Sequence, residues 1–137
     1  MPLEFETLHH VSIVVNDLPR AKQFYGDVLG LQEIPRPPFS FDGAWFRAGD
    51  RDLHLIVTTD PTFRTGKRLD TQDGHLAFRV KSFRRALAYL ESKGFRTTDD
   101  EPGRSMRVNA ESVAGFPQIH IMDPDRNIVE INAERLE

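Results

Sequence analysis

The sequence predicts an α+β fold built from two similar modules, each running β-α-β-β with room for one more strand. Segment 10–21 resembles segment 75–86, and both begin with an alternating, strand-like run that leads into a helical pattern. The chain has 137 residues, which suits a single domain. We therefore expect one domain over residues 1–137, with module one at about 7–60, a linker at 61–73 and module two at about 74–134.

Each module is expected to contain one helix with a single buried stripe. Asp17 and Ser82 are suitable N-cap residues, and Gly30 and Gly94 are suitable residues at which the helices end. The apolar residues between these limits follow the i, i+3, i+4 spacing of a helix: Ala21, Phe24, Tyr25, Val28 and Leu29 in the first, and Phe83, Ala86, Leu87 and Leu90 in the second.

Short extended runs follow each helix and predict the remaining strands. The Pro-rich stretch 34–40 is expected to be a loop that crosses to the next strand. A module with one helix and a half-covered sheet cannot bury its apolar face alone, so we expect the two modules to pair. The expected strands are residues 43–48 and 52–58 in module one, and 107–110, 118–122 and 128–132 in module two.

The composition excludes several classes of protein. The formal net charge is −3 with both signs interspersed, so no basic patch is expected to bind nucleic acid or a membrane surface. The chain has no cysteine, which excludes a disulfide scaffold, a thiolate nucleophile and cysteine-built metal sites. No apolar run approaches the roughly 20 residues of a membrane span, and the first residues lack a signal-peptide charge pattern. We therefore expect a cytoplasmic protein whose metal chemistry would use His, Asp and Glu.

Strand alternation predicts a polar face on each sheet. Residues i and i+2 of a strand share a face, and the apolar positions mark the face that is covered by the helix. If the opposite faces line a common concave surface, several imidazoles and one carboxylate converge there. Such ligands suit zinc, nickel, iron(II), manganese or cobalt and leave open positions for a substrate. The polar faces are expected to carry His10, His54, His75, Gln118, His120 and Glu130.

Three stretches of the sequence match a known family. They are Leu8–Leu18 (LHHVSIVVNDL), Gly74–Val80 (GHLAFRV) and Asp123–Glu130 (DPDRNIVE). On the basis of these motifs, the sequence resembles the vicinal oxygen chelate superfamily over almost its whole length. This superfamily includes glyoxalase I, fosfomycin-resistance and bleomycin-resistance proteins, methylmalonyl-CoA epimerase and extradiol dioxygenases. The resemblance implies two paired βαβββ modules that form a curved mixed sheet around a metal cavity.

The resemblance also implies a ligand set for a divalent metal ion, drawn from the first and last strands of each module. His10, His75 and Glu130 match three ligand positions, and His54 falls on the fourth, which is usually Glu or Gln. Glu130 is also expected to act as a general base. Arg126 stands where the family often has Gly.

Four further residues are expected to bind substrate. By strand parity, Ser12, Gln118 and His120 line the same pocket as the ligands, and we expect them to touch the substrate rather than the metal. Arg79 is a candidate for holding an anionic group of the substrate.

The predicted function is metal-dependent, glyoxalase-like lyase or isomerase chemistry on a small substrate that is chelated through adjacent oxygens. Two alternatives are a fosfomycin-resistance-like thiol transferase and an iron(II) dioxygenase. A further alternative is a non-catalytic protein that sequesters a small molecule, as bleomycin-resistance proteins do; those members lack the metal set. Family members with a single pair of modules often dimerise, so we expect a homodimer.

Overall fold

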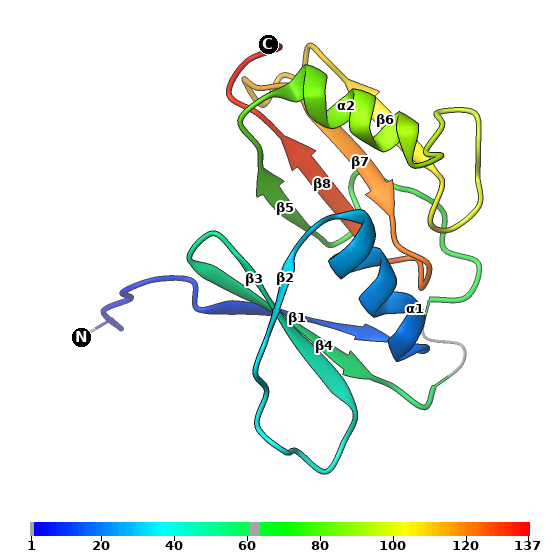
Figure 1. Cartoon of the computed structure of the whole chain (residues 1–137). Helices are drawn as coiled ribbons and strands as arrows, with labels where there is room; N and C mark the ends of the chain where they lie inside the picture. The colour runs from blue at the N-terminus through cyan, green and yellow to red at the C-terminus, as the bar shows by residue number, and fades with distance from the viewer. Residues whose placement is uncertain (1, 61–63) are drawn as a thin grey trace.

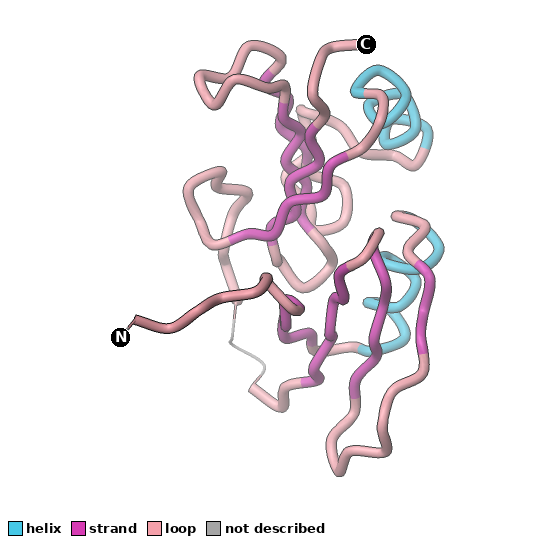
Figure 2. The backbone as a smooth tube through the Cα atoms, turned by 90° about the vertical axis from the view of Figure 1, so that its left-hand side faces the viewer, coloured by secondary structure: helices cyan, strands magenta, loops and turns pink. Residues whose placement is uncertain are grey.

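The computed structural model describes residues 2–60 and 64–137 and places their strands in two four-stranded sheets, one per module (Figure 1). The first three residues of the predicted linker, 61–63, lie outside the described residues. The first sheet has the strand order β1-β4-β3-β2, and the second has the equivalent order β5-β8-β7-β6. The predicted α+β class and the internal repeat are confirmed, and Figure 2 shows the strands gathered in two separate groups.

The elements of each module have well-defined bounds. Within the described ranges, neither module has a helix that is long and apolar enough to cross a membrane. Module one contains β1 His10–Val15, α1 Leu18–Lys22, the π-helix η1 Gln23–Val28, β2 Gln32–Ile34, β3 Gly43–Ala48 and β4 Arg51–Val57. Module two contains β5 His75–Arg79, α2 Phe83–Ser92, β6 Met106–Asn109, β7 Gln118–Met122 and β8 Ile128–Asn132.

The helix starts follow from the predicted caps. The side chain of Asp17 accepts a hydrogen bond from the Arg20 amide at 3.1 Å, and that of Ser82 accepts one from the Arg85 amide at 3.2 Å. Each bond satisfies one of the amides that a helix start leaves without an intrahelical partner. Beyond the helices, Gly94 has a φ of 97°, a left-handed conformation that is easily reached only by glycine.

Two features of module one differ from the sequence prediction. The first helix widens after Lys22 into a π-helix, in which the Leu29 amide donates to the Phe24 carbonyl at 2.8 Å. The apolar spacing fits an α-helix and does not reveal this change, and Phe24 and Tyr25 are buried in the π-helix that forms. The second feature is β2, a strand of three residues, which is too short to show alternation and stops before Pro35.

The helix-covered faces of both sheets pack into one hydrophobic core. Phe24 of η1 and Phe95 after α2 meet edge to face, with ring centroids 6.2 Å apart. The polar faces predicted for the strands are turned away from this core, on the opposite side of each sheet. The most buried apolar residues of the core include Val15, Tyr25, Phe46, Leu53 and Leu55 from module one and Phe95, Ile119, Ile121 and Val129 from module two.

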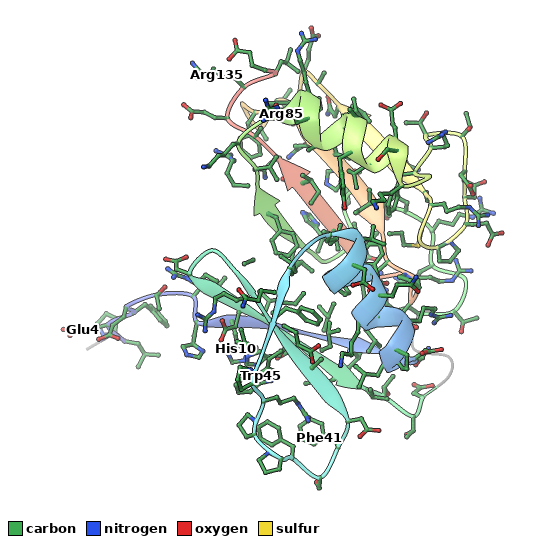
Figure 3. The ribbon with its side chains drawn as sticks, in the orientation of Figure 1. Glu4, His10, Phe41, Trp45, Arg85 and Arg135 are labelled. Atoms are coloured by element: carbon green, nitrogen blue, oxygen red, sulfur yellow. The ribbon has the colours of Figure 1, made fainter. Side chains whose placement is uncertain are left out.

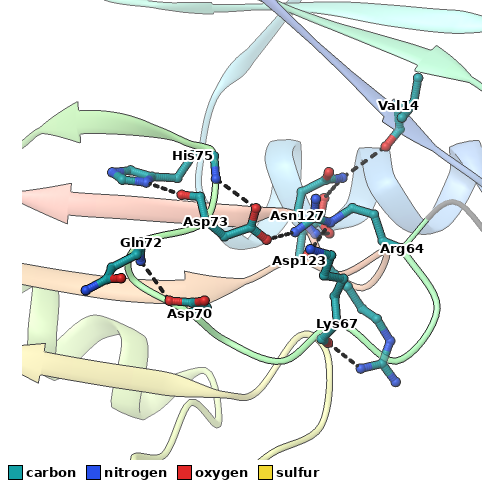
Figure 4. A network of polar contacts seen from close by, with 11 residues as sticks. Val14, Arg64, Lys67, Asp70, Gln72, Asp73, His75, Asp123 and Asn127 are labelled. Atoms are coloured by element: carbon teal, nitrogen blue, oxygen red, sulfur yellow. Dashed lines mark hydrogen bonds and ion pairs between the residues drawn. The ribbon is translucent and has the colours of Figure 1, made fainter.

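A buried carboxylate in the turn between β7 and β8 ties the modules together. Asp123 accepts a hydrogen bond from the Tyr25 hydroxyl at 2.7 Å, and bonds from the amides of Asp125 and Asn127 at 2.9 and 2.8 Å. The Asn127 side chain donates to Asp123 and also to the Val14 carbonyl of β1, each at 3.0 Å (Figure 4). Both sequence-distant contacts, to Tyr25 and to Val14, join module two to module one.

The surroundings of Asp123 change its acidity and that of Tyr25. Burial raises the pKa of Asp123, and the hydrogen bonds from Asn127 and Tyr25 oppose that rise. Burial, together with the charge of Asp123, raises the pKa of Tyr25 well above its ordinary value. The Tyr25 hydroxyl therefore stays protonated at neutral pH and remains a donor to the carboxylate.

Replacing Tyr25 with Phe should lower the free energy of unfolding by about 1–2 kcal/mol, because a buried acceptor loses one of its donors. Urea unfolding of the two proteins measures the loss. Tyr89→Phe is the matched control, because it also removes a hydrogen bond from a tyrosine hydroxyl, here to the Val28 carbonyl. Tyr89 is 42% exposed, so this change should lower the free energy of unfolding by no more than about 0.5 kcal/mol. Equal losses in both variants would contradict the role given to Asp123.

Candidate metal site

Three potential metal ligands meet on the polar face of the second sheet. Glu130 of β8 lies opposite His120 of β7 in the antiparallel register, and His75 comes from the start of the parallel neighbour β5. The Nε2 atoms of His75 and His120 are each 3.3 Å from Oε1 of Glu130. One ligand atom from each of the three residues lies within 4.8 Å of the other two. The side chain of His75 is 29% exposed and the other two are buried, so the group opens toward solvent on the His75 side.

The tautomer of His75 is fixed by a backbone carbonyl. Its Nδ1 lies 2.8 Å from the carbonyl oxygen of Asp73, which can only accept, so Nδ1 carries the hydrogen (Figure 4). Asp73 is itself held, because its carboxylate accepts from Arg64 and from the Gly74 amide. The Arg64 hydrogen bond also lowers the pKa of Asp73. In this tautomer, the neutral form of the His75 ring presents the Nε2 lone pair to Glu130.

This arrangement fits a divalent cation. An unprotonated Nε2 and a carboxylate oxygen repel each other at 3.3 Å unless a proton or a metal ion lies between them. Two atoms bound to one zinc-sized ion at about 2.0–2.2 Å lie roughly 3.0–3.5 Å apart, which agrees with both Nε2–Oε1 distances. Burial lowers the pKa of His120. The His120 ring is therefore neutral at pH 7, the form in which imidazole binds metals.

The second carboxylate oxygen of Glu130, Oε2, accepts a hydrogen bond from the side-chain amide of Asn132. Nδ2 of Asn132 donates to Oε2 of Glu130 at 2.5 Å, and Nε of Arg79 donates to Oδ1 of Asn132 at 2.6 Å. The Arg79 guanidinium also lies over the ring of Phe116, 5.0 Å from its centroid. Glu130 therefore turns one oxygen to the two histidines and the other to Asn132.

Module one carries a stack of rings on its own polar face. His54 of β4 lies between Trp45 of β3, with centroids 4.0 Å apart, and His10 of β1, with centroids 4.2 Å apart. His9 adds a further ring, whose Nδ1 is 2.9 Å from Nδ1 of His10. Figure 3 shows His10 and Trp45 close to each other on this module. Nε2 of His54 is buried and has no hydrogen-bond partner among residues 2–60 and 64–137, and Oδ2 of Asp52 is 3.9 Å away.

Comparison with known proteins identifies the family. The sequence model of the Glyoxalase/Bleomycin resistance protein/Dioxygenase superfamily matches residues 7–131. The chain belongs to this superfamily. A sequence relative, the uncharacterised protein YwkD of Bacillus subtilis (strain 168), is 27% identical over 130 residues, which cover 92% of this chain and 95% of the relative.

Solved structures of the superfamily share the fold. A glyoxalase family protein from Bacillus anthracis has a TM-score of 0.76 at 20% identity, covering 97% of this chain and 98% of that one. The fosfomycin resistance protein FosX from Listeria monocytogenes has a TM-score of 0.69 at 15% identity, with 95% and 94% covered. Lactoylglutathione lyase from Agrobacterium tumefaciens has a TM-score of 0.66 at 19% identity, with 93% and 92% covered.

The structure divides the predicted ligands of this superfamily member between its two modules. His75 and Glu130 meet, whereas His10 and His54 lie together in module one. Among the described residues, the group of three potential ligands within 4.8 Å contains neither His10 nor His54. It contains His120 instead, a residue that the sequence predicts to bind substrate.

The predicted substrate residues also have defined places. Ser12 pairs with His54 in the register of β1 and β4, and Gln118 pairs with Asn132 in that of β7 and β8. Arg79 bonds Asn132 through Nε. Asn132 is not among the residues predicted from the sequence, although its position two residues after Glu130 on one strand places both side chains on the same face.

Trp45, the single tryptophan of the chain, should report the charge of His54. A protonated imidazole stacked on an indole quenches its fluorescence. Burial lowers the pKa of His54 below the ordinary value of 6.5, with the charge of His10 adding to the effect. As pH falls, emission should therefore decrease with a midpoint below 6.5.

The His54→Gln variant should lose this transition in the fluorescence titration. His75→Gln is the control, because His75 lies in the other sheet, and it should keep the transition. A transition that survives in His54→Gln would contradict the stacked arrangement.

Proposed function

We propose that this superfamily member is a metal-dependent enzyme with glyoxalase-like lyase or isomerase chemistry on a small substrate that binds through adjacent oxygens. The observation that carries this proposal is the convergence of two imidazole nitrogens on one carboxylate oxygen, each at 3.3 Å. Neutral imidazoles and a carboxylate form a donor set that suits a divalent first-row metal. Two of the three residues, His75 and Glu130, also match ligand positions that the family resemblance implies.

The residues have distinct roles in this proposal. His75 and Glu130 hold the ion, and Asp73 keeps the His75 ring in the tautomer that presents Nε2. The neutral imidazoles of His75 and His120 and the single carboxylate of Glu130 would leave a divalent ion with net positive charge. This charge would stabilise negative charge that develops on a bound enolate or alkoxide. Glu130 is also the proposed general base, through Oε1 when this oxygen is not bound to the ion. Gln118 and Ser12 are proposed to contact the substrate.

We further propose that a second copy of the chain completes the site. His10 and His54 lie on the polar face of a different sheet from His75 and Glu130. In a symmetric homodimer, module one of one copy can cover the polar face of module two of the other, which brings His10 and His54 to the metal. The partners of this protein are then a small-molecule substrate and a second copy of itself.

Metal binding tests the proposal directly. Protein stripped with a chelator should bind one divalent ion per chain when titrated with Zn²⁺ or Co²⁺ in a calorimeter. His75→Ala and Glu130→Gln should each weaken the binding by more than about 100-fold, because the first removes a ligand and the second replaces a charged carboxylate oxygen with a neutral amide oxygen. Glu33→Gln, which changes an exposed carboxylate in β2, is the control and should leave the affinity unchanged.

Absence of stoichiometric metal binding by the unmodified protein would overturn the proposal. In that case the alternative function, sequestration of a small molecule without catalysis as in bleomycin-resistance proteins, becomes the better description of this protein.

Mixed dimers test the contribution of the second copy. If each site takes His10 from one chain and Glu130 from the other, His10→Ala and Glu130→Gln homodimers both lose tight metal binding. A dimer with one chain of each kind then regains one intact site. Differently tagged chains, refolded together and purified through both tags, should bind about one ion per mixed dimer. If mixing restores nothing, the site does not combine these two residues across chains.

One observation favours a second candidate function. His75, His120 and Glu130 form a set of two histidines and one carboxylate within one chain, the set found in iron(II) enzymes that activate oxygen. In this case His120→Ala should abolish iron(II) binding and His10→Ala should leave it intact. Oxygen consumption by the iron(II)-loaded protein with candidate substrates then distinguishes a dioxygenase from a lyase or isomerase, which consumes none.

A further inference from the structure

We propose that Asn132 and Arg79 position Glu130 so that it offers the metal a single oxygen. This inference rests on the proposed metal site and adds two positioning residues to it. It also gives Arg79 a different role from the substrate contact expected from the sequence, because its Nε is used inside the protein.

The first step is the bond from Asn132 to Glu130. Nδ2 of Asn132 is 2.5 Å from Oε2 of Glu130, whereas Oε1 faces both histidines. A carboxylate whose Oε2 accepts this hydrogen bond is held with Oε1 toward the histidines. Glu130 then occupies one coordination position, and a second position stays open for a substrate oxygen.

The second step is the orientation of the Asn132 amide. An amide has an acceptor end and a donor end, and its two orientations differ only in which end faces which neighbour. Arg79 has only donors, and its Nε lies 2.6 Å from Oδ1 of Asn132. Arg79 therefore requires the oxygen of the amide on its side, which leaves Nδ2 to donate to Glu130.

The contacts from Arg79 through Asn132 to Glu130 are held rigidly. Arg79 is a register neighbour of Asn132 on the parallel strands β5 and β8, so the two side chains leave the sheet side by side. The guanidinium also lies over the ring of Phe116, 5.0 Å from its centroid, which restricts its movement. Asn132 and Glu130 are both buried, so water does not easily replace the bond between them.

Removal of either positioning residue should weaken the metal site without unfolding the protein. In Asn132→Leu, which keeps the branching of the side chain at Cγ but removes the donor, we expect the Kd for Zn²⁺ to rise about 10- to 100-fold. In Arg79→Met the Kd should rise by a smaller factor, and Arg79→Lys should restore much of the affinity because lysine can donate to the same oxygen. Calorimetry of the full-length protein measures each Kd, and the midpoint of thermal unfolding of the metal-free form reports folding.

Spectra of the Co²⁺-loaded protein provide a second measurement, which would not change if Asn132 served only to stabilise the fold. A carboxylate that binds through both oxygens instead of one changes the coordination number, so the visible absorption of Co²⁺ should shift in Asn132→Leu. The matched control is Asn109→Leu, the same change in the same row of the sheet two strands away, which should alter neither the Kd nor the spectrum.

The outcomes separate the two proposals. If Asn132→Leu and Arg79→Met bind Zn²⁺ as tightly as the unmodified protein, while His75→Ala and Glu130→Gln do not, the positioning role is wrong and the metal site stands. If His75→Ala and Glu130→Gln also bind normally, the metal site itself is wrong. If Asn132→Leu does not fold, the comparison of Arg79→Met with Arg79→Lys decides the positioning role, because Arg79 is exposed and its replacement spares the core.

Discussion

The buried carboxylate of Asp123 is the contact on which the rest of the structure depends. It accepts hydrogen bonds from its own turn and from Tyr25 of the other module, and its neighbour Asn127 reaches the backbone of β1. A charged group can be buried in this way only when donors surround it, because unsatisfied charge in a protein interior is very unfavourable. The same turn precedes β8, the strand that carries Glu130. Packing between the modules and placement of the proposed ligand thus share one short segment.

Much of the fold could be predicted because its local signals are strong. The strands β3, β7 and β8 have the predicted bounds, and β4 and β6 begin one residue earlier than predicted. The caps at Asp17 and Ser82 also form as expected. The π-helix and β2 could not be predicted, since a π-turn keeps the same residues buried and three residues show no alternation.

The candidate site was predicted only in part, for a different physical reason. Alternation decides which face of a strand a side chain occupies, and it predicts a polar face with His75, His120 and Glu130, whose ligand atoms lie within 4.8 Å of one another. It cannot decide how two sheets lie relative to each other, because that depends on how the shared core packs. His10 and His54 therefore have the expected parity but belong to another surface of the same chain.

The left-handed turn residue Arg126 links the backbone of this turn to the proposed site. Its φ of 71° costs about 1–2 kcal/mol for a residue with a side chain, a strain that glycine would avoid. Its guanidinium donates to the Lys67 carbonyl, while its own carbonyl accepts from Arg64, the residue that holds Asp73 beside His75. The bulkier residue thus fastens the segment before β5 to the β7–β8 turn. Glycine at position 126 would relieve the backbone strain, but it would also remove the guanidinium that binds the Lys67 carbonyl.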